Sequence, residues 1–235
     1  LVDALGDFRT YLDANPREVV TIYIENAQPF SAADMAKAFK DAKLDAYAYA
    51  PANSTAAWPT LSAMISSGKR LVVFSDRNAD ASVAPWILDE NSYSVQTSFS
   101  VAQGSSFDCQ PLRTVRPLWV MNHFVYTNYT VGASSFDSPA PNAAASVNTE
   151  SSIESQATLC QAAGHMPNFV AVDFYDVGDV FRAVATINKV SYRSTTTNTF
   201  GSNDGELKSA KSAAPPATAP LTMASACALL LLTLF

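Results

Sequence analysis

The chain has 235 residues, of which 48% are hydrophobic and 15% are charged, a composition typical of a globular protein and not of a disordered one. Its net charge is −6, from 15 Lys and Arg against 21 Asp and Glu, so nucleic acid is not an expected partner. Three cysteines, two histidines and the lack of any Cys-x-x-Cys pair exclude most zinc sites.

Helices and strands are predicted to alternate in the first third of the chain. Leucines at helical spacing predict a first helix, which must end before Pro16. Ser31 with Asp34 is a capping pattern for a second helix, and Thr60 and Gly68 bound a third. The predicted helices span 1–15, 31–44 and 60–68, and the predicted strands span 18–24 and 70–75.

The same alternation continues in the second half. Strands are predicted at 118–124 and 168–174, and helices at 150–163 and 178–188. All four predicted strands are continuous apolar runs, which is typical of strands covered on both faces in parallel sheets. The sequence therefore indicates an α/β fold, either an open doubly wound sheet or a barrel. Asp176 is expected to cap the last helix, with Asp179 in its first turn.

The composition divides the chain into three parts. Residues 1–190 form the predicted domain, 191–211 a Ser/Thr/Asn-rich, disordered stalk, and 212–235 an uncharged, apolar tail. The apolar run 221–235 is shorter than the roughly 20 residues of a spanning helix, and small residues with prolines precede it. This pattern predicts a GPI-anchor signal, with Ser212 as the attachment site, although a short tail anchor or an unstructured end would also fit.

The start of the chain and its cysteines add two further expectations. The chain opens on Leu1 with no visible signal peptide, so we expect a domain that begins before this sequence does. Cys227 lies in the tail, which leaves Cys109 and Cys160 as a predicted disulfide of an oxidising compartment, or as two buried thiols. The sequons at Asn53 and Asn128 are candidate glycosylation sites.

Polar residues follow the predicted strands where an α/β fold places its working site. In parallel folds that site lies beyond the carboxyl ends of the strands. The candidate binding residues are Glu25, Arg77, Asn122, His123, Asp173 and Tyr175. In an extended strand Asp173 and Tyr175 would share one face.

Each candidate has a structural alternative. Glu25 could be a surface acid, His123 a core histidine with its hydrogen bonds satisfied, and Asp173 an ion-pair partner of Arg77 or Arg113. His165 stands in a turn and is expected to be exposed and without a role. A glycosidase would need two carboxylates facing each other, for which Glu25 and Asp173 are the obvious pair.

Four segments resemble one family in the order that the family has them. The segments 12–26, 58–76, 119–124 and 167–188 resemble the phosphatidylinositol-specific phospholipase C X-domain superfamily, and more narrowly its secreted, membrane-anchored fungal members. The family fold is a distorted TIM barrel, so the resemblance implies a partial barrel here, with strands about the fourth to the eighth. It also implies a cell-surface, extracellular phosphodiesterase whose partner is a phospholipid or glycolipid headgroup.

The resemblance does not supply catalytic residues. The family uses two histidines as acid and base, and neither His123 nor His165 stands in its catalytic motif, so no catalytic residue is assigned in this chain. The parent protein is expected to cleave phosphodiesters, with the present segment inactive alone; a binding module or a pseudoenzyme is the alternative. Glu25 matches a calcium ligand of animal members, whereas bacterial members need no metal, so the expected cofactor is calcium or none. Phe74 and Asp76 stand where animal members have phosphate-binding lysines, which argues against highly phosphorylated inositides.

Overall fold

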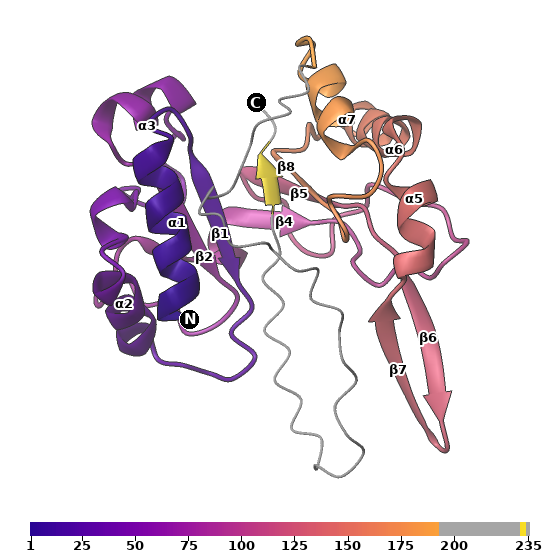
Figure 1. Ribbon diagram of the computed structural model, residues 1–235, viewed down its shortest axis with the longest axis horizontal. Coiled ribbons are helices and arrows are strands. Elements are labelled where there is room, and N and C mark those ends of the chain that lie inside the picture. Colours follow the sequence, from indigo (N-terminus) through magenta and orange to yellow (C-terminus); the bar gives the residue numbers. More distant parts are fainter. Residues whose placement is uncertain (193–230, 234–235) are drawn as a thin grey trace, which may run out of the picture.

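The structure is a computed structural model that describes residues 1–192 and 231–233 (Figure 1). Most of the predicted stalk and of the predicted tail, Ser212 included, lies outside the described residues. The strands are β1 (Val20–Ile24), β2 (Leu71–Ser75), β3 (Ile87–Asp89), β4 (Ser94–Gln96), β5 (Leu118–Asn122), β6 (Tyr126–Val131), β7 (Ser134–Pro139), β8 (Phe169–Ala171) and β9 (Leu231–Thr233). The α-helices are α1 (Val2–Ala14), α2 (Ala32–Asp41), α3 (Leu61–Ser67), α4 (Glu90–Tyr93), α5 (Ala144–Val147), α6 (Glu150–Ala162) and α7 (Val180–Ile187), with 3-10 turns at Asp45–Tyr47 and Pro141–Ala143.

Parallel pairing joins strands in chain order, as the apolar runs predicted. β1, β2 and β3 form one parallel sheet, in which Val20 lies opposite Leu71 and Val73 lies opposite Ile87. β4, β5 and β8 form a second parallel sheet, and β9 adds to β8 in the antiparallel direction. The described residues therefore form a mixed α/β fold with two parallel sheets and no closed barrel. The α/β class is confirmed, whereas the finer expectation of a partial TIM barrel is not.

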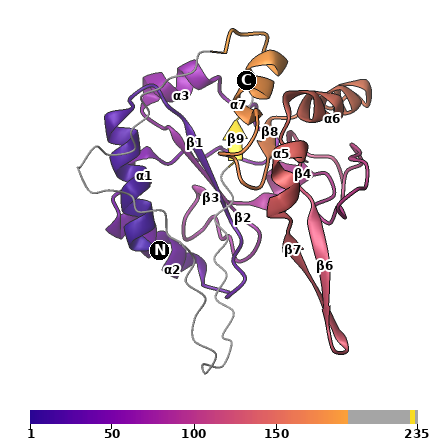
Figure 2. The same ribbon diagram turned by 45° about the vertical axis from the view of Figure 1, so that its right-hand side comes forward.

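The two sheets share one inner layer of side chains. Leu71 and Val73 face an outer core with α1 and α2, whereas Phe74 faces an inner core to which both sheets contribute. There the ring centre of Tyr23 lies 4.7 Å from that of Phe74 and 5.7 Å from that of Phe169 on β8. Helices α6 and α7 cover the outer face of the second sheet, while α1 and α2 cover that of the first (Figure 2). Both sheets thus curve around a common core.

The predicted helix caps are present. The Ser31 hydroxyl accepts the backbone N–H of Asp34, whose carboxylate accepts the N–H of Ser31, so the capping box of α2 is complete. Thr60 accepts the N–H of Ala63 at the start of α3, and Gly68 ends that helix with a φ of 72°. No helix of the described residues is long and apolar enough to cross a bilayer.

The strand predicted at 168–174 is shorter than expected. β8 ends at Ala171, and Phe174 has a left-handed φ of 55°. The prediction that Asp173 and Tyr175 share a strand face is therefore wrong, because both lie in a loop. The apolar run continues past the strand, so periodicity alone could not mark its end.

Two helix boundaries also differ from the predictions. α2 ends at Asp41 and a 3-10 turn follows, so the helix is shorter than 31–44. Asp176 does not cap α7; the residue at that position is Asp179, and its side chain makes no capping hydrogen bond. The turn after α2 is closed by local backbone hydrogen bonds, from Lys43 to Lys40 and from Leu44 to Phe39. The start of α7 is held by a tertiary contact, in which Asp179 N–H donates to the carbonyl of Asn148, and local sequence does not show it.

Several short elements were not predicted. β3, α4 and β4 together cover only residues 87–96, too few for a hydrophobic period to show. The hairpin of β6 and β7 follows β5 and has mostly exposed residues, with the rings of Tyr129 and Phe136 stacked across it. Its polar sequence is typical of a loop, because neither face of the hairpin packs on the core and its residues therefore do not alternate between apolar and polar.

Candidate functional site

The carboxyl ends of the parallel strands carry polar residues along one edge of the two sheets. Glu25 follows β1, Asp76 follows β2 and Glu90 follows β3. Asn122 ends β5, and Asp173 follows β8 by two residues. The structure divides these residues into three groups with different environments.

The first group lies at the ends of β1 and β2. Asp76 accepts the backbone N–H of Asn26 at 2.7 Å and pairs with Arg77, whose Nε lies 3.3 Å from its carboxylate. Burial, and then the charge of Asp76, raise the pKa of Glu25 above its usual range. Arg77 therefore forms its ion pair with Asp76, and the alternative that it pairs with Asp173 is wrong.

The second group is a buried network between β3 and β5. Gln96 donates to the Glu90 carboxylate at 2.9 Å, and Asn122 donates to the side-chain oxygen of Gln96 at 2.9 Å and to the carbonyl of Thr97 at 2.8 Å. Arg113 reaches Glu90 at 3.9 Å, so it does not pair with Asp173 either. Burial raises the pKa of Glu90, and Arg113 opposes that shift. The Oδ1 atom of Asn122 is buried and has no hydrogen-bond partner.

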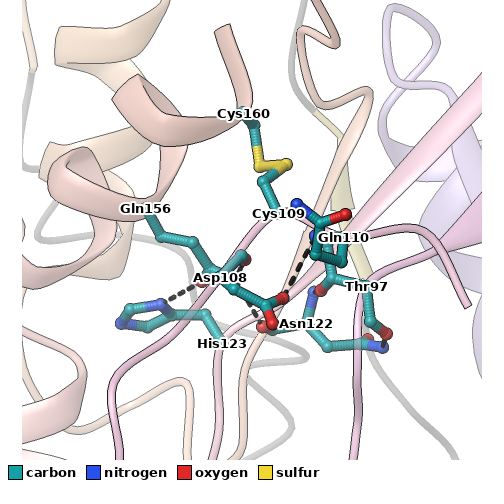
Figure 3. Close-up of a disulfide and its surroundings, with 8 residues drawn as sticks. All are labelled: Thr97, Asp108, Cys109, Gln110, Asn122, His123, Gln156 and Cys160. Carbon is teal, nitrogen blue, oxygen red and sulfur yellow. Dashed lines mark hydrogen bonds between the residues drawn. A yellow bond between two sulfur atoms is a disulfide. The ribbon is translucent and has the colours of Figure 1, made fainter. Parts of the chain in front are cut away.

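His123 continues this network into the second sheet's outer core (Figure 3). Its Nδ1 lies 2.6 Å from Oε1 of Gln156, and its Nε2 lies 2.9 Å from the carbonyl of Val147. The Gln156 amide donates to the carbonyls of Asp108 and Asn122, so its oxygen is left to accept from the imidazole. His123 is fully buried, and in its neutral form Nδ1–H donates to Gln156 while Nε2 can accept from the Ser152 hydroxyl, 3.1 Å away, the environment of a satisfied core histidine.

The predicted disulfide is present beside this network. Cys109 and Cys160 are joined, with Cα atoms 5.0 Å apart, and the bond ties the segment between β4 and β5 to α6. Gln156 stands one turn before Cys160 on the same helix. The disulfide thus holds α6 where Gln156 can bind His123 (Figure 3).

The burial of His123 makes stability depend on pH in a defined direction. Burial lowers its pKa more than its hydrogen bonds to Gln156 and Val147 raise it. The unfolded chain, with an ordinary histidine pKa near about 6.5, then binds a proton that the folded chain does not. We expect stability to fall as the pH drops below that value, by up to about 1.4 kcal/mol per pH unit, until the lowered pKa is reached.

Urea unfolding of the wild type and of His123→Gln between pH 7.5 and 5 measures this contribution. Glu25, Glu90 and Asp173 have raised pKa values and act in the opposite direction, but both proteins contain them. The difference between the two pH profiles therefore isolates His123. Equal slopes in the two proteins would contradict the expectation.

The third group is the loop after β8. The Asn148 amide donates to the carbonyls of Asp173, Phe174 and Val177, at 2.8, 3.2 and 3.2 Å. One carboxylate oxygen of Asp173 is buried without a hydrogen-bond partner, and burial raises the pKa of this carboxyl. Asp173 also lines a cavity of about 10 Å³, room for roughly one water molecule. Tyr175, two residues on, is exposed.

Two further expectations can be compared with these contacts. His165 is not freely exposed as expected, because its ring stacks on Trp119 with centres 4.2 Å apart. Burial, and then the charge of Asp76, raise the pKa of Glu25, and burial raises that of Asp173; the glycosidase pairing of these two carboxyls stays a prediction.

The described residues do not offer a cage for calcium. No three His, Cys, Asp or Glu side chains of the described part stand close enough together to hold a metal ion. Asp76 is the acidic group whose charge raises the pKa of Glu25, and Arg77 already pairs with that carboxylate. Calcium takes about six to eight oxygen ligands, so these donors do not fit it.

Sequence reasoning missed several residues of the networks. Glu90 and Gln96 lie in segments with no predicted element, and Arg113 was considered only as a partner of Asp173. Gln156 could have been found, because it shares the buried face of a predicted helix with Ile153 and Cys160. Asn148 gave no signal, since its three acceptors lie 25 to 29 residues away in sequence.

Comparison with known proteins places the chain in a family. A model of the PI-PLC X family (PI-PLC X 1) matches residues 1–188. A PI-PLC X domain-containing protein 1 of Arthroderma benhamiae is 35% identical over 195 residues, covering 78% of this chain and 63% of that protein. An uncharacterized secreted protein of the same fungus is 29% identical, covering 77% of this chain and 45% of that protein.

A PI-PLC X domain-containing protein of Arabidopsis thaliana is 27% identical over 206 residues, 80% of this chain and 44% of that protein. The alignments thus span between 44% and 63% of these relatives' own lengths. No solved structure matches the chain. The family match over nearly all of the described residues, and the 35% identity to a named member, show that the chain belongs to the PI-PLC X domain family.

Proposed function

We propose that residues 1–188 are the later strands of a PI-PLC X barrel, and that their carboxyl edge binds the polar headgroup of a phospholipid or glycolipid. The whole protein would then be a phosphoric diester hydrolase acting on phosphatidylinositol or a related lipid. Family membership, the parallel strands and the inner core shared by the two sheets support this proposal.

The proposal rests on one observation, the buried carboxylate oxygen of Asp173 that has no hydrogen-bond partner. A buried carboxylate oxygen without a partner costs free energy, and its raised pKa reflects that cost. The adjoining cavity has room for about one water molecule, through which a ligand hydroxyl could supply the missing hydrogen bond. An inositol headgroup carries several such hydroxyls, and Tyr175 offers an exposed ring in the same loop.

Acid–base catalysis is not assigned to this chain's histidines. His123 is fully buried within its network, and His165 is stacked on Trp119. This observation also favours the second candidate, a binding module or pseudoenzyme that holds a headgroup without cleaving it. The two candidates share the binding step and differ in turnover.

Location and modification follow as further proposals. A relative named as a secreted protein and the Cys109–Cys160 disulfide support an extracellular protein. Asn53 and Asn128 are both exposed, as glycosylation would require. GPI anchoring at Ser212 remains a proposal from the sequence, as do the stalk at 191–211 and the tail at 212–235.

Binding of inositol 1-phosphate, followed by isothermal titration calorimetry, tests the headgroup site. We expect binding by the wild type and an affinity about tenfold lower or worse in Asp173→Asn, because a hydrogen bond to a charged acceptor is lost. Asp176→Asn removes an exposed carboxylate of the same loop and should change little. Absence of binding at millimolar ligand, or equal loss in both variants, would contradict the proposed site.

Turnover separates the two candidates. Release of water-soluble inositol phosphate from phosphatidylinositol vesicles is expected from the whole protein if the enzyme proposal is right. The 235-residue chain alone is expected to bind without release. Binding without release by the whole protein as well would establish the non-catalytic candidate.

A further inference from the structure

A cavity of about 390 Å³ lies between the loop after β4 and the segment that joins the hairpin to α6. We call it the outer cavity, and Gln103, Ser105, Phe107, Ser146 and Ser152 line it from these two sides. Its volume lies in the range of roughly 300–1,000 Å³ that is typical of small-molecule sites. None of the candidate binding residues at the strand ends, all of which the structure describes, lines it.

The outer cavity is separate from the small cavity beside Asp173. Val125 and Val147 line both cavities and therefore lie between them. The outer cavity adjoins α6 through Ser152, whose hydroxyl lies 3.1 Å from Nε2 of His123. A ligand in the outer cavity would leave the position beside Asp173 open.

The lining of the outer cavity is electrically neutral. Among the described residues, no Asp, Glu, Lys, Arg or His side chain lines it. An ionised ligand would lose water there without gaining an opposite charge, which is costly. Val125, Ala143 and Val147 add an apolar part to the polar one. The cavity therefore fits a neutral ligand that has both polar and apolar surface.

The hydrogen bonds within the lining decide which polar groups a ligand can use. The Ser146 hydroxyl donates to the carbonyl of Ala143 at 2.8 Å, and with neutral His123 the Ser152 hydroxyl donates to Nε2. A hydroxyl has one proton and two lone pairs, so both serines are left as acceptors. The side-chain oxygen of Gln103 accepts a hydroxyl proton from the hairpin, which leaves its amide N–H groups as donors.

Two acceptors beside one amide donor select hydroxyl groups in the ligand, because a hydroxyl can both donate and accept. A carboxylate or a phosphate only accepts, so its oxygens would meet the lone pairs of both serines. The same lining therefore disfavours an anion and favours a polyhydroxylated ligand.

Phe107 provides a flat apolar wall. Its ring is stacked on that of His123, with centres 4.1 Å apart and planes inclined by 29°. This stacking covers one face of the Phe107 ring and fixes its position, so the opposite face and the edge are left for the cavity. A ligand ring with C–H groups on one face and hydroxyls at its edge matches this wall and the two serines together.

We propose that the outer cavity binds a neutral sugar ring, whose hydroxyls donate to Ser146 and Ser152 and whose C–H face lies on Phe107. This binding goes beyond the headgroup function and does not depend on it, because the two cavities are separate. The sugar could belong to a separate saccharide or to a glycan on Asn128 of the adjoining hairpin. Both sources present the same chemistry to the cavity.

Saturation-transfer NMR with the methyl glycosides of glucose, mannose, galactose and N-acetylglucosamine tests the site on the unglycosylated 235-residue chain. We expect millimolar or tighter binding of at least one, with amide shifts in 103–107 and 143–152 and none in 172–177. The corresponding methyl uronide, in which a carboxylate replaces the hydroxymethyl group, should bind at least about tenfold more weakly. No binding by any of the glycosides, shifts centred on 172–177, or tighter binding of the uronide would overturn the proposal.

Ser146→Ala tests the acceptor without disturbing His123, because it breaks only the recorded hydrogen bond to the Ala143 carbonyl. We expect the affinity for the glycoside to fall by about three- to tenfold, the effect of one neutral hydrogen bond. Ser152→Ala should act in the same direction. Ser151→Ala, an exposed neighbour outside the lining, is the control and should leave the affinity unchanged. Unchanged affinity in Ser146→Ala, or an equal loss in Ser151→Ala, would contradict the proposal.

Glycosylated protein identifies the source of the sugar. A glycan on Asn128 that fills the cavity would block added glycoside in the glycosylated wild type and not in Asn128→Gln, whereas equal binding to both assigns a separate saccharide. Inositol 1-phosphate is charged and is expected to shift the amides of 172–177 instead. Failure with inositol 1-phosphate and success with a glycoside would reject the headgroup site alone, and the reverse pattern would reject the outer cavity alone.

Discussion

Replacing Cys109 and Cys160 together by alanine lowers the free energy of unfolding by about 4 kcal/mol. The two cysteines are 51 residues apart, and in the chain-entropy account a cross-link that closes a loop of this length removes about that much free energy from the unfolded ensemble. Both residues are buried, so removing their sulfur atoms leaves small cavities, which add to the loss and do not offset it. Urea unfolding of the oxidised wild type and of the double variant measures the difference.

Loss of the disulfide should also weaken the hydrogen bond between Gln156 and His123. Without the cross-link the segment around Asp108 is free to leave α6, and Gln156 then loses one of the two carbonyls that orient its amide. We expect faster hydrogen exchange at Gln156 and in the segment 103–112, with β1 and β2 unchanged. Cys227→Ser is the matched control and should alter neither quantity. A double variant within about 1 kcal/mol of the wild type would contradict the expectation.

The sequence predicted those parts of the fold that local chemistry determines. Ser31 with Asp34, and Thr60 with Gly68, marked two helices because their caps are made by neighbours along the chain. The run 70–75 predicted β2 because it is buried on both faces and therefore wholly apolar.

The remaining elements depend on contacts between distant segments. β3 and β4 are three-residue strands that exist because β2 and β5 pair with them. β8 ends at Ala171, although the sequence continues to Phe174 in the same apolar pattern, because Asn148 holds the carbonyls that follow. Periodicity carries no information about such a partner.

The candidate site shows the same division. Glu25, Asn122 and Asp173 could be selected from the sequence because each lies at the end of a predicted strand, and parallel strands align their ends. The burial of each candidate side chain could not be predicted: Asn122 and His123 are buried in a network, whereas Tyr175 is exposed. That network runs through Glu90 and Gln156, which the sequence places far from either residue. Burial and pairing, more than residue type, decide which polar side chains can meet a ligand.

The buried amide of Asn148 is the second group whose removal should have a large effect. In Asn148→Ala the carbonyls of Asp173, Phe174 and Val177 lose their shared donor. Leaving a buried acceptor unsatisfied costs about 1–3 kcal/mol. One amide bonds to three carbonyls here, and because these bonds are part-buried, water offsets part of the summed cost. We expect a loss of about 3 kcal/mol in the free energy of unfolding, measured with urea, whereas exposed Asn142→Ala should stay within about 0.5 kcal/mol of the wild type.

The same substitution should release the loop that carries Asp173. Gly178, at a φ of 90°, lets the backbone pass Asn148 so closely that an added Cβ would lie 2.5 Å from its carbonyl oxygen. Asn148 and Gly178 therefore fix the loop from both sides, and Gly178→Ala should reproduce the effect of Asn148→Ala. Limited proteolysis within 173–179 is expected to be slow in the wild type and fast in both variants. If both variants lose stability while this loop stays protected, Asn148 supports α5 and α6 alone, and the loop's conformation has another origin.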